Sequence, residues 1–372
     1  MRHTVRAIFG VFLTAFLAGS IHAEDKKPAP LSEKQIAEGW ISLFDGETTF
    51  GWVVSGDVTV KNGAIQIAAG KPAKLMPKLW LGSPFEILIE FQGPLDLHYG
   101  TTEASFYANN EVGAKIFKSY IHTPQLPGSL NKTTSSAGGT MNHLVEPRKE
   151  LAKNLAVIET TGKAAVAIRT LRIRPLQLPP LFNGKDLSGW KLFKGDPKRE
   201  LSTFDVTKDG ELHVANGPGD LQTEKTFADF VLQFECKTNG KGLNSGIFFR
   251  CIANEYQNGY EAQIQNLYLN EDRTKPVDSG TGAIYRRIPA RKVVSNDNEW
   301  FTLTVVANKD HFSTWVNGYQ TVDWTDDRKP DDNPRKGLRT GAGHLSIQGH
   351  DKTTDILFRN IRVLEMKSPE KP

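Results

Sequence analysis

Five polar side chains in the last third of the 372-residue chain have the chemistry of a binding or catalytic site. They are a guanidinium, a carboxylate, two amides and an imidazole, carried by Arg250, Glu261, Gln263, Gln348 and His350. Each group forms directed or bidentate hydrogen bonds, which suits a ligand rich in hydroxyl groups. The alternative is an ordinary solvated sheet face.

The segments around these residues alternate between apolar and polar side chains, which is typical of strands with one buried face. We expect the core side to be formed by Phe230, Leu232, Phe234, Cys236, Ile247, Phe249, Cys251, Tyr260, Ala262, Ile264, Leu345 and Ile347. The opposite side then carries Gln233, Glu235, Phe248, Arg250, Glu261, Gln263, Gln265, Ser346 and Gln348. The candidates are therefore predicted to share one polar sheet face, with His350 just beyond it.

The two cysteines, Cys236 and Cys251, lie near the ends of two of these segments. Asn239-Gly240-Lys241-Gly242 between them favours a hairpin, which would place the cysteines side by side. In an exported protein they would then form a disulfide or pack as two thiols, and the residues leave both alternatives open.

Strand signals continue through the rest of the chain. Residues 300–306 and 311–316 alternate around the turn Asn308-Lys309-Asp310, and Asn317-Gly318 then turns into residues 319–322. No segment after residue 40 has the pattern of a long amphipathic helix. The sequence therefore predicts an all-β fold of antiparallel, concanavalin A-like jelly-roll sandwiches.

The chain contains two unequal copies of one pattern. Residues 43–52 and 181–190 share one pattern, in which Leu-Phe-(Asp or Asn)-Gly is followed closely by Gly-Trp. Residues 62–67 also resemble 209–214, and residues 168–173 resemble 358–363. These matches predict two domains in tandem, a degenerate copy at 40–176 and a full copy at 180–366. Residues 24–39 are expected to form a tail with a short helix over Ser32–Glu38.

The first 23 residues have the pattern of an export signal. Arg2, His3 and Arg6 precede an apolar run at 7–18, and small residues follow up to Ala23. The run is short for a membrane span, which needs about 20 apolar residues, although an uncleaved anchor is the alternative. No cysteine near the cleavage site could carry a lipid. We expect a periplasmic or secreted protein without membrane attachment after cleavage.

Charge and motifs exclude several function classes. Without Arg2 and Arg6 the chain has 44 basic and 42 acidic residues, so its net charge is 44 − 42 = +2. The sequence has no stripe of basic residues, so a nucleic-acid partner is not expected. Dinucleotide, P-loop and zinc-protease motifs are absent. No cofactor is predicted with certainty, and a divalent cation stays open. An acidic loop could hold calcium or be merely solvated: Asp323, Asp326, Asp327, Asp331 and Asp332.

The second copy resembles the 3-keto-disaccharide hydrolase family. The matching stretches are residues 181–190, Asn244-Ser-Gly-Ile-Phe-Phe-Arg250, Gly259-Tyr-Glu-Ala-Gln263, Thr281-Gly-Ala-Ile-Tyr285, 316–318, Ile347-Gln-Gly-His350 and 358–362. The resemblance implies a concanavalin A-like jelly-roll, a secreted protein and action on glycosides oxidised to a ketone at C3. The first copy keeps only the opening and closing signatures, which implies a non-catalytic role. This chain has Gln265-Asn266 where the family often has Asp-Asn.

The resemblance also implies a reaction, because a ketone at C3 acidifies the hydrogen at C2 and the aglycone can then leave C1 by elimination. Glu261 or His350 is expected to be the base, with the other assisting the leaving oxygen, and Arg250 is expected to stabilise the enolate. The substrate, an oligosaccharide or glycoside, is expected to contact Gln263, Gln348, Asn244, Tyr285 and Glu235. The rival functions are a non-catalytic sugar-binding module and a scaffold that docks a partner through the first copy.

Overall fold

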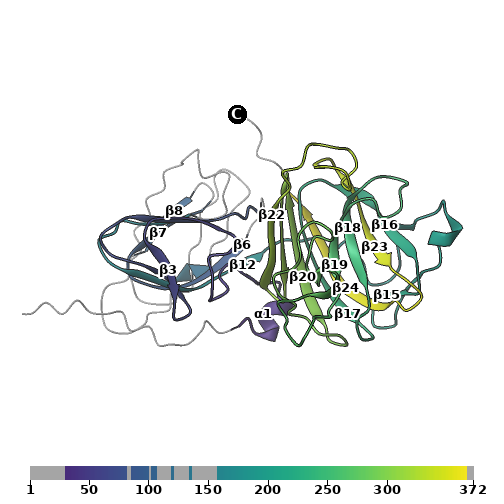
Figure 1. Cartoon of the computed structure of the whole chain (residues 1–372), viewed down its shortest axis with the longest axis horizontal. Coiled ribbons are helices and arrows are strands. Elements are labelled where there is room, and N and C mark those ends of the chain that lie inside the picture. Colours follow the sequence, from purple (N-terminus) through teal and green to yellow (C-terminus); the bar gives the residue numbers. More distant parts are fainter. Residues whose placement is uncertain are drawn as a thin grey trace, which may run out of the picture.

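The computed structural model describes residues 30–81, 85–99, 102–106, 119–120, 134–135 and 157–366, so the expected signal peptide lies outside the described part of the chain. The described chain consists almost wholly of antiparallel strands and is all-β, as predicted (Figure 1). Its helices are short, and none within these ranges is long and apolar enough to cross a membrane. The predicted short helix is present as α1 (Glu33–Ala37), capped by Ser32, whose Oγ accepts a hydrogen bond from the Gln35 amide.

The N-terminal part is built on two five-stranded sheets. The first contains β1 (Ile41–Ser42), β12 (Val166–Pro175), β4 (Ala64–Ile67) and β3 (Val58–Lys61), with β6 (Phe85–Gln92) also paired to β12. The second contains β2 (Trp52–Ser55), β5 (Ala73–Pro77), β11 (Val157–Thr160), β7 (Leu95–Tyr99) and β8 (Thr102–Phe106). A separate pair is formed by β9 (Ser119–Tyr120) and β10 (Thr134–Ser135).

The C-terminal part is a jelly-roll sandwich of a five-stranded and a seven-stranded sheet. The five-stranded sheet has the order β13 (Trp190–Leu192), β16 (Gly219–Phe227), β23 (Gly343–Gly349), β18 (Ser245–Cys251) and β19 (Tyr260–Ile264). The seven-stranded sheet has the order β14 (Thr203–Val206), β15 (Leu212–Ala215), β24 (Asp355–Glu365), β17 (Phe230–Thr238), β20 (Phe301–Asn308), β21 (His311–Val316) and β22 (Tyr319–Thr325). Short 3-10 turns lie at Pro197–Arg199 and Val277–Ser279.

One strand order occurs in both parts. In the N-terminal part β3, β4, β12 and β6 pair in succession, and in the C-terminal part β14, β15, β24 and β17 do the same. The sequence motifs that open and close each copy lie at or near these strands. The two parts therefore share a common half-sheet, on which the longer C-terminal part adds further strands.

The predicted alternation places the sandwich core correctly. Apolar residues of β17, β18 and β19 point between the two C-terminal sheets and are almost fully buried: Phe230, Leu232, Phe234, Ile247, Phe249, Tyr260, Ala262 and Ile264. The predicted hairpin of β20 and β21 is present, with Lys309 in the left-handed region at φ 53°. The Asn317-Gly318 turn leads into β22, with φ values of 48° and 77°.

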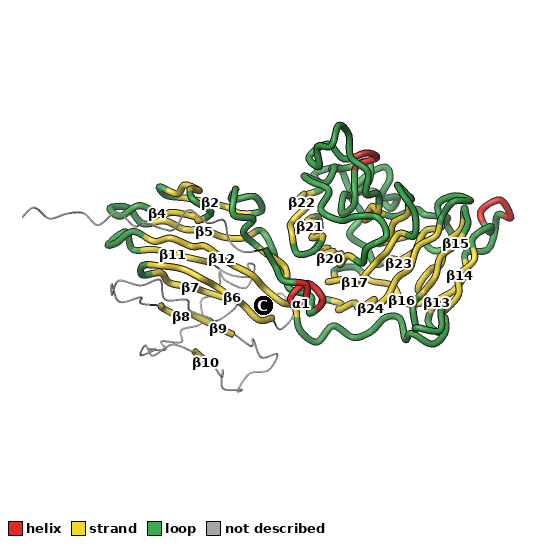
Figure 2. Tube along the Cα trace, turned by 90° about the horizontal axis from the view of Figure 1, so that it is seen from below, coloured by secondary structure: helices red, strands yellow, loops and turns green. Residues whose placement is uncertain are grey.

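The outer face of the seven-stranded sheet packs against the N-terminal part. Val231, Val306 and Trp315 belong to the hydrophobic core of the N-terminal sheets, and the Trp315 indole donates a 3.0 Å hydrogen bond to the Ser42 carbonyl. Arg291 forms a 2.9 Å ion pair with Asp45 across the same boundary. Helix α1 lies at this junction (Figure 2). The outer face of the five-stranded sheet points away from the N-terminal part.

The expected hairpin between the cysteine strands is wrong. Cys236 lies in β17, where it pairs with Phe301 and Phe358, and Cys251 lies in β18, where it pairs with His344. These strands belong to opposite sheets of the sandwich, so the glycine-rich turn is a crossover between layers. Both cysteines are buried free thiols, and burial raises the pKa of each well above its ordinary value.

Candidate active site

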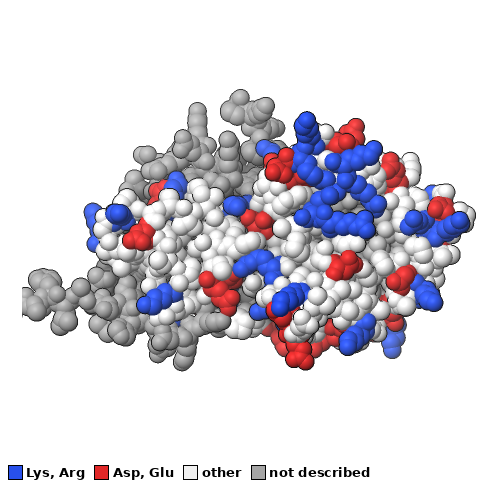
Figure 3. Space-filling view, in the orientation of Figure 1, with Lys and Arg blue, Asp and Glu red and all other residues white. Residues whose placement is uncertain are grey.

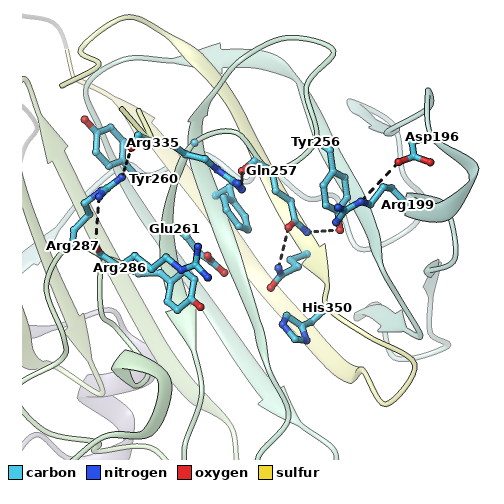
Figure 4. Close-up of a pocket in the computed structure, with 14 residues that line it drawn as sticks. Asp196, Arg199, Tyr256, Gln257, Tyr260, Glu261, Arg286, Arg287, Arg335 and His350 are labelled. Atoms are coloured by element: carbon cyan, nitrogen blue, oxygen red, sulfur yellow. Dashed lines mark hydrogen bonds and ion pairs between the residues drawn. The ribbon is translucent and has the colours of Figure 1, made fainter. Parts of the chain in front are cut away.

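A cavity of about 720 Å³ opens on the outer face of the five-stranded sheet (Figure 4). Strands β18, β19 and β23 form its floor, and the loops that follow β13, β18, β19, β22 and β23 form its walls. The cavity is lined by Asp196, Arg199, Phe248, Tyr256, Gln257, Gly259, Tyr260, Glu261, Tyr285, Arg286, Arg287, Arg335, Gln348 and His350. All of these residues belong to the C-terminal part, so the site does not use the N-terminal sheets.

Strand register sets the floor of the cavity. Glu261 of β19 lies opposite Phe248 of β18, which in turn lies opposite Ser346 of β23, so the three side chains form one row on the outer face. Beside Glu261 the neighbouring strand has Gly246. A Cβ at Gly246 would lie 2.6 Å from Glu261 Oε1 and 2.8 Å from its Cγ. The glycine therefore provides the space that the Glu261 side chain occupies.

Glu261 is the most perturbed ionisable group on this floor. Its side chain is only 6% exposed, and burial raises its pKa from 4.5 to about 8. The positive charges of Arg335 and Arg286 oppose this shift, while Asp278 adds to it. A carboxyl group with a pKa near neutrality can accept or donate a proton at physiological pH, which is the property of a general base or acid.

Gln348 and His350 follow one another along β23 and the turn after it, and both line the cavity. Gln348 Nε2 donates to Gln257 Oε1 at 3.1 Å, whereas the buried Gln348 Oε1 has no hydrogen-bond partner among the described residues. His350 is exposed at the rim, and its Nδ1 lies 2.9 Å from Asp351 Oδ2. The cavity thus offers an unpaired amide acceptor and an imidazole oriented by a carboxylate.

A second buried carboxylate, Asp220 of β16, lies opposite the cavity residue Gln348 in the strand register and was not predicted. Ser346 Oγ donates to it, as does Gln222 Nε2 at 3.2 Å, and the Gln257 amide lies 3.4 Å away. Burial raises its pKa from 3.8 to about 6. Asp220 holds the backbone of Gln257 in place rather than lining the cavity. The alternation of Asp220 and Gln222 around Leu221 was the sequence signal for this position.

The walls carry four arginines that sequence reasoning also missed: Arg199, Arg286, Arg287 and Arg335. Loop residues follow no period, so alternation could not have found them; the adjacent pair after Tyr285 was the only hint. Tyr285, a predicted contact residue, lies in the cavity with the Arg286 guanidinium 5.2 Å from its ring centre. Gln257 and Arg286 adopt left-handed backbone conformations, at φ 46° and 57°.

Arg250, which was expected at the substrate, does not line the cavity. A bulge interrupts the pairing of β18 with β23 between Phe248 and Cys251, and Arg250 itself has a φ of 52°. The bulge turns its side chain away from the cavity, so that it is fully buried. It donates to the carbonyl groups of Ala228, Lys309 and Arg339 and pairs with Asp229 at 3.0 Å. Arg250 therefore ties three loops together.

Three predicted contact residues also lie outside the cavity lining. Glu235 belongs to the opposite, seven-stranded sheet, where it binds Arg359 at 2.7 Å and the Asn360 amide at 2.5 Å. Asn244 and Gln263 flank the cavity and both donate to Asp278 Oδ2, at 2.7 and 3.2 Å. For Glu235 the reason is topological, because alternation assigns a residue to a face but does not say which sheet that face belongs to.

No group of three or more histidine, cysteine or carboxylate side chains is arranged to hold a metal ion within the described residues. The acidic loop instead makes ion pairs: Asp326 binds Arg328 at 2.7 Å, and Asp323 binds His311 at 2.9 Å. Gln265, where the related family often has aspartate, braces a loop by donating to the Gly242 carbonyl at 3.2 Å. Asp323, Asp326 and Gln265 are thus engaged in contacts with other residues of the chain.

Comparisons with known proteins agree with the resemblance seen in the motifs. A profile of the 3-keto-alpha-glucoside-1,2-lyase-like domain matches residues 178–364. No curated protein matches the chain. Two solved structures of candidate glycosyl hydrolases from Parabacteroides distasonis are similar to this chain. The first is 23% identical, covers 50% of this chain and 93% of its own, and has a TM-score of 0.41. The second is 26% identical, covers 52% of this chain and 85% of its own, and has a TM-score of 0.39.

A carbohydrate-binding module from Bacillus subtilis is also similar, at 17% identity over 47% of this chain and 94% of the module, with a TM-score of 0.32. The family profile covers half of the chain, including every residue of the cavity lining. The chain therefore belongs to the 3-keto-alpha-glucoside-1,2-lyase-like domain family, and it is a hydrolase-like, carbohydrate-active protein.

Proposed function

We propose that this protein cleaves glycosides whose sugar carries a ketone at C3, by removing the C2 proton and eliminating the aglycone. The observation that carries the proposal is Glu261, a carboxyl group at the floor of a sugar-sized cavity, buried and with its pKa raised to about 8. Ordinary glycosidases use two spaced carboxyl groups across the scissile bond. The other carboxylate in this lining, Asp196, lies beside Arg199 on the far wall (Figure 4).

The proposed reaction begins when the Glu261 carboxylate takes the proton from C2. The electron pair of that C–H bond forms an enolate with the C3 carbonyl. The enolate then collapses, so that the C3 carbonyl reforms, a C1–C2 double bond forms and the C1–O bond to the aglycone breaks. Water can later add across the double bond. A base with a pKa near 8 suits the first step, because proton transfer is most efficient when the pKa lies near the working pH.

Arg286 is the residue that we assign to the enolate in place of Arg250. Figure 4 shows its side chain beside Glu261, and its charge is one of those that lower the pKa of Glu261. A guanidinium in this position stabilises the negative charge that develops on the C3 oxygen. Arg286 itself is exposed on the cavity wall, whereas Glu261 beside it is buried.

His350 is assigned to the leaving group. It lies at the exposed rim of the cavity, where an aglycone can extend into solvent, and Asp351 Oδ2 lies 2.9 Å from its Nδ1 and orients the ring. His350 is proposed to donate a proton to the aglycone oxygen as the C1–O bond breaks. Gln348 and Tyr256 complete the site, one with an unpaired buried acceptor for a sugar hydroxyl and the other with an aromatic ring.

The test is incubation with a methyl 3-keto-glucoside while the 2-hydroxy-glucal intermediate and the released methanol are measured. We expect the Glu261→Gln variant to lose about 10²- to 10⁴-fold in kcat/KM, the usual worth of a general base. Replacement of the exposed Glu224 of β16 by glutamine is the matched control and should leave the rate unchanged. Full activity in both Glu261→Gln and His350→Ala would refute the assignment.

A non-catalytic sugar-binding function is the alternative, and the aromatic rings of Phe248, Tyr256 and Tyr285 in the lining favour it. A binding module would retain the keto-glucoside or its parent glucoside without forming a product. Its affinity would fall on Tyr256→Ala and Tyr285→Ala and would not change on Glu261→Gln. The same set of variants therefore separates the two functions.

We also propose that the protein acts outside the cytoplasm. The basic start, the short apolar run and the small residues up to Ala23 support export and cleavage. Sequencing of the N-terminus of the protein recovered from its native host should begin at Glu24. An N-terminus at residue 1 or 2 in a cytosolic fraction would contradict this part of the proposal.

A further inference from the structure

The cavity carries more positive charge than the proposed reaction needs. Its lining contains four arginines but only two carboxyl groups, Asp196 and Glu261. Figure 3 shows lysine and arginine side chains gathered over the upper part of the C-terminal sheets. A neutral keto-sugar develops one negative charge, on its enolate oxygen, and Arg286 lies beside Glu261 to meet it. The charge of Arg335 also acts on Glu261, whereas Arg199 and Arg287 have no role in that chemistry.

Two of the remaining arginines are held against one loop. Arg335 Nη2 donates to the Gln257 carbonyl at 2.6 Å, and the Arg199 guanidinium lies 4.6 Å from the ring centre of Tyr256. In Figure 4 they lie on either side of this Tyr256-Gln257 pair. The loop itself is fixed, because Gln257 Nε2 donates to the Tyr256 hydroxyl at 2.8 Å and its left-handed backbone is held over Asp220.

Arg287 supports the same arrangement from behind. Its guanidinium donates to the carbonyl group of Arg335 at 2.8 Å and so restrains the loop that carries Arg335. The Arg287 guanidinium therefore donates its hydrogen bonds to backbone carbonyl groups. Arg335 uses only its Nη2 in the bond to Gln257, so its other N–H donors can face the cavity. The positions of the two wall guanidiniums are thus prepared before any ligand binds.

These guanidiniums lack a strong acidic partner in the described part of the chain. The one arginine–carboxylate ion pair within the lining is Asp196–Arg199, which is long at 3.9 Å and has both side chains about half exposed. Exposed ion pairs of this kind contribute little. Clustered like charges repel one another, so an anion between them would be stabilised, and guanidinium groups bind carboxylate and sulfate through paired hydrogen bonds.

We propose that the glycoside accepted by this cavity carries an anionic substituent, a carboxylate or a sulfate ester, bound by Arg335 and Arg199 on the Tyr256-Gln257 wall. The inference rests on the proposed function, because it assumes that the sugar lies over Glu261. It adds a substrate class, acidic glycosides, that the family resemblance does not supply.

The experiment measures binding by calorimetry at low salt, with no turnover required. The probes are methyl glucoside, methyl glucuronide and glucose 6-sulfate, each with wild type, Arg335→Gln and the Arg335→Gln/Arg199→Gln double variant. We expect wild type to bind at least one of the anionic sugars about 10-fold or more tightly than the neutral one, and the double variant to lose that preference. The control is Arg362→Gln, which removes an exposed arginine from β24 in the opposite sheet and should keep it.

The arms separate the possible outcomes. Preference for the glucuronide alone assigns a carboxylate, and preference for the sulfated sugar alone assigns a sulfate ester. Equal affinity for all three sugars, a preference that survives in the double variant, or inorganic sulfate binding as tightly as the sulfated sugar would each overturn the inference. Failure of the proposed function is distinguishable, because selective binding of an acidic sugar without elimination from its 3-keto form would contradict the reaction and keep the anion site.

Discussion

Replacement of the proposed base by its neutral isostere should stabilise the protein at alkaline pH. In Glu261→Gln the shape of the side chain is kept while the buried charge is lost. Wild type must ionise a carboxyl group that is 6% exposed and whose folded-state pKa is about 8, whereas the variant has nothing to ionise. A gain in stability together with a loss of activity is the behaviour expected of a group kept for function at a structural cost.

The magnitude follows from the two pKa values of Glu261, about 8 in the folded protein and 4.5 as the ordinary value. Between these values the folded state binds the extra proton, so the stability of wild type falls as the pH rises. At about 1.4 kcal/mol per pH unit the loss is roughly 1 kcal/mol at pH 5, 3 kcal/mol at pH 7 and 5 kcal/mol at pH 9. Above the folded pKa the loss levels off.

Urea unfolding followed by tryptophan fluorescence at pH 5, 7 and 9 would measure this difference. Relative to wild type, Glu261→Gln should gain about 4 kcal/mol more at pH 9 than at pH 5. The raised pKa of Asp220 gives a pH dependence of its own, which both proteins share apart from its coupling to the Glu261 charge. Glu224→Gln serves as the exposed control and should show no such trend. A difference that stays constant with pH, or one that favours wild type at pH 9, would refute the reasoning.

Three further outcomes are expected. Gly246→Ala should reduce kcat/KM at least 10-fold, because the added methyl group displaces Glu261, and should lower the free energy of unfolding by about 1–3 kcal/mol. A fully active variant would show that the position of the carboxyl group is not critical. Arg250→Met should destabilise the fold by about 3–5 kcal/mol in urea unfolding, because it removes the partner charge of Asp229 and the donors to three carbonyl groups. Normal stability with lost activity would instead return Arg250 to the reaction. A reducing agent should leave the thermal midpoint unchanged because both thiols are free, and a fall of several degrees would reveal a disulfide.

The alternation of apolar and polar residues predicted well which side chains are buried, but it predicted poorly which side chains lie next to one another. It placed Ile247, Phe249 and Ala262 in the core correctly, because side chains on successive strand residues must point to opposite faces. It misplaced Arg250, because one bulge residue reverses the faces that follow it. It also grouped Glu235 with Glu261, although the strands that carry them belong to different sheets.

The sequence by itself determined the all-β class, the turns, the family and the polar character of the face that carries Glu261, Gln348 and His350, since these depend on periods and motifs that are local in the chain. Only the tertiary structure decided which polar residues meet. The crossover between sheets separated the cysteines, the bulge buried Arg250, and loops distant in the sequence brought Arg199 and Arg335 to one wall. Contacts between residues that are distant in the sequence depend on the order of the strands and the path of the loops, which local side-chain patterns do not encode.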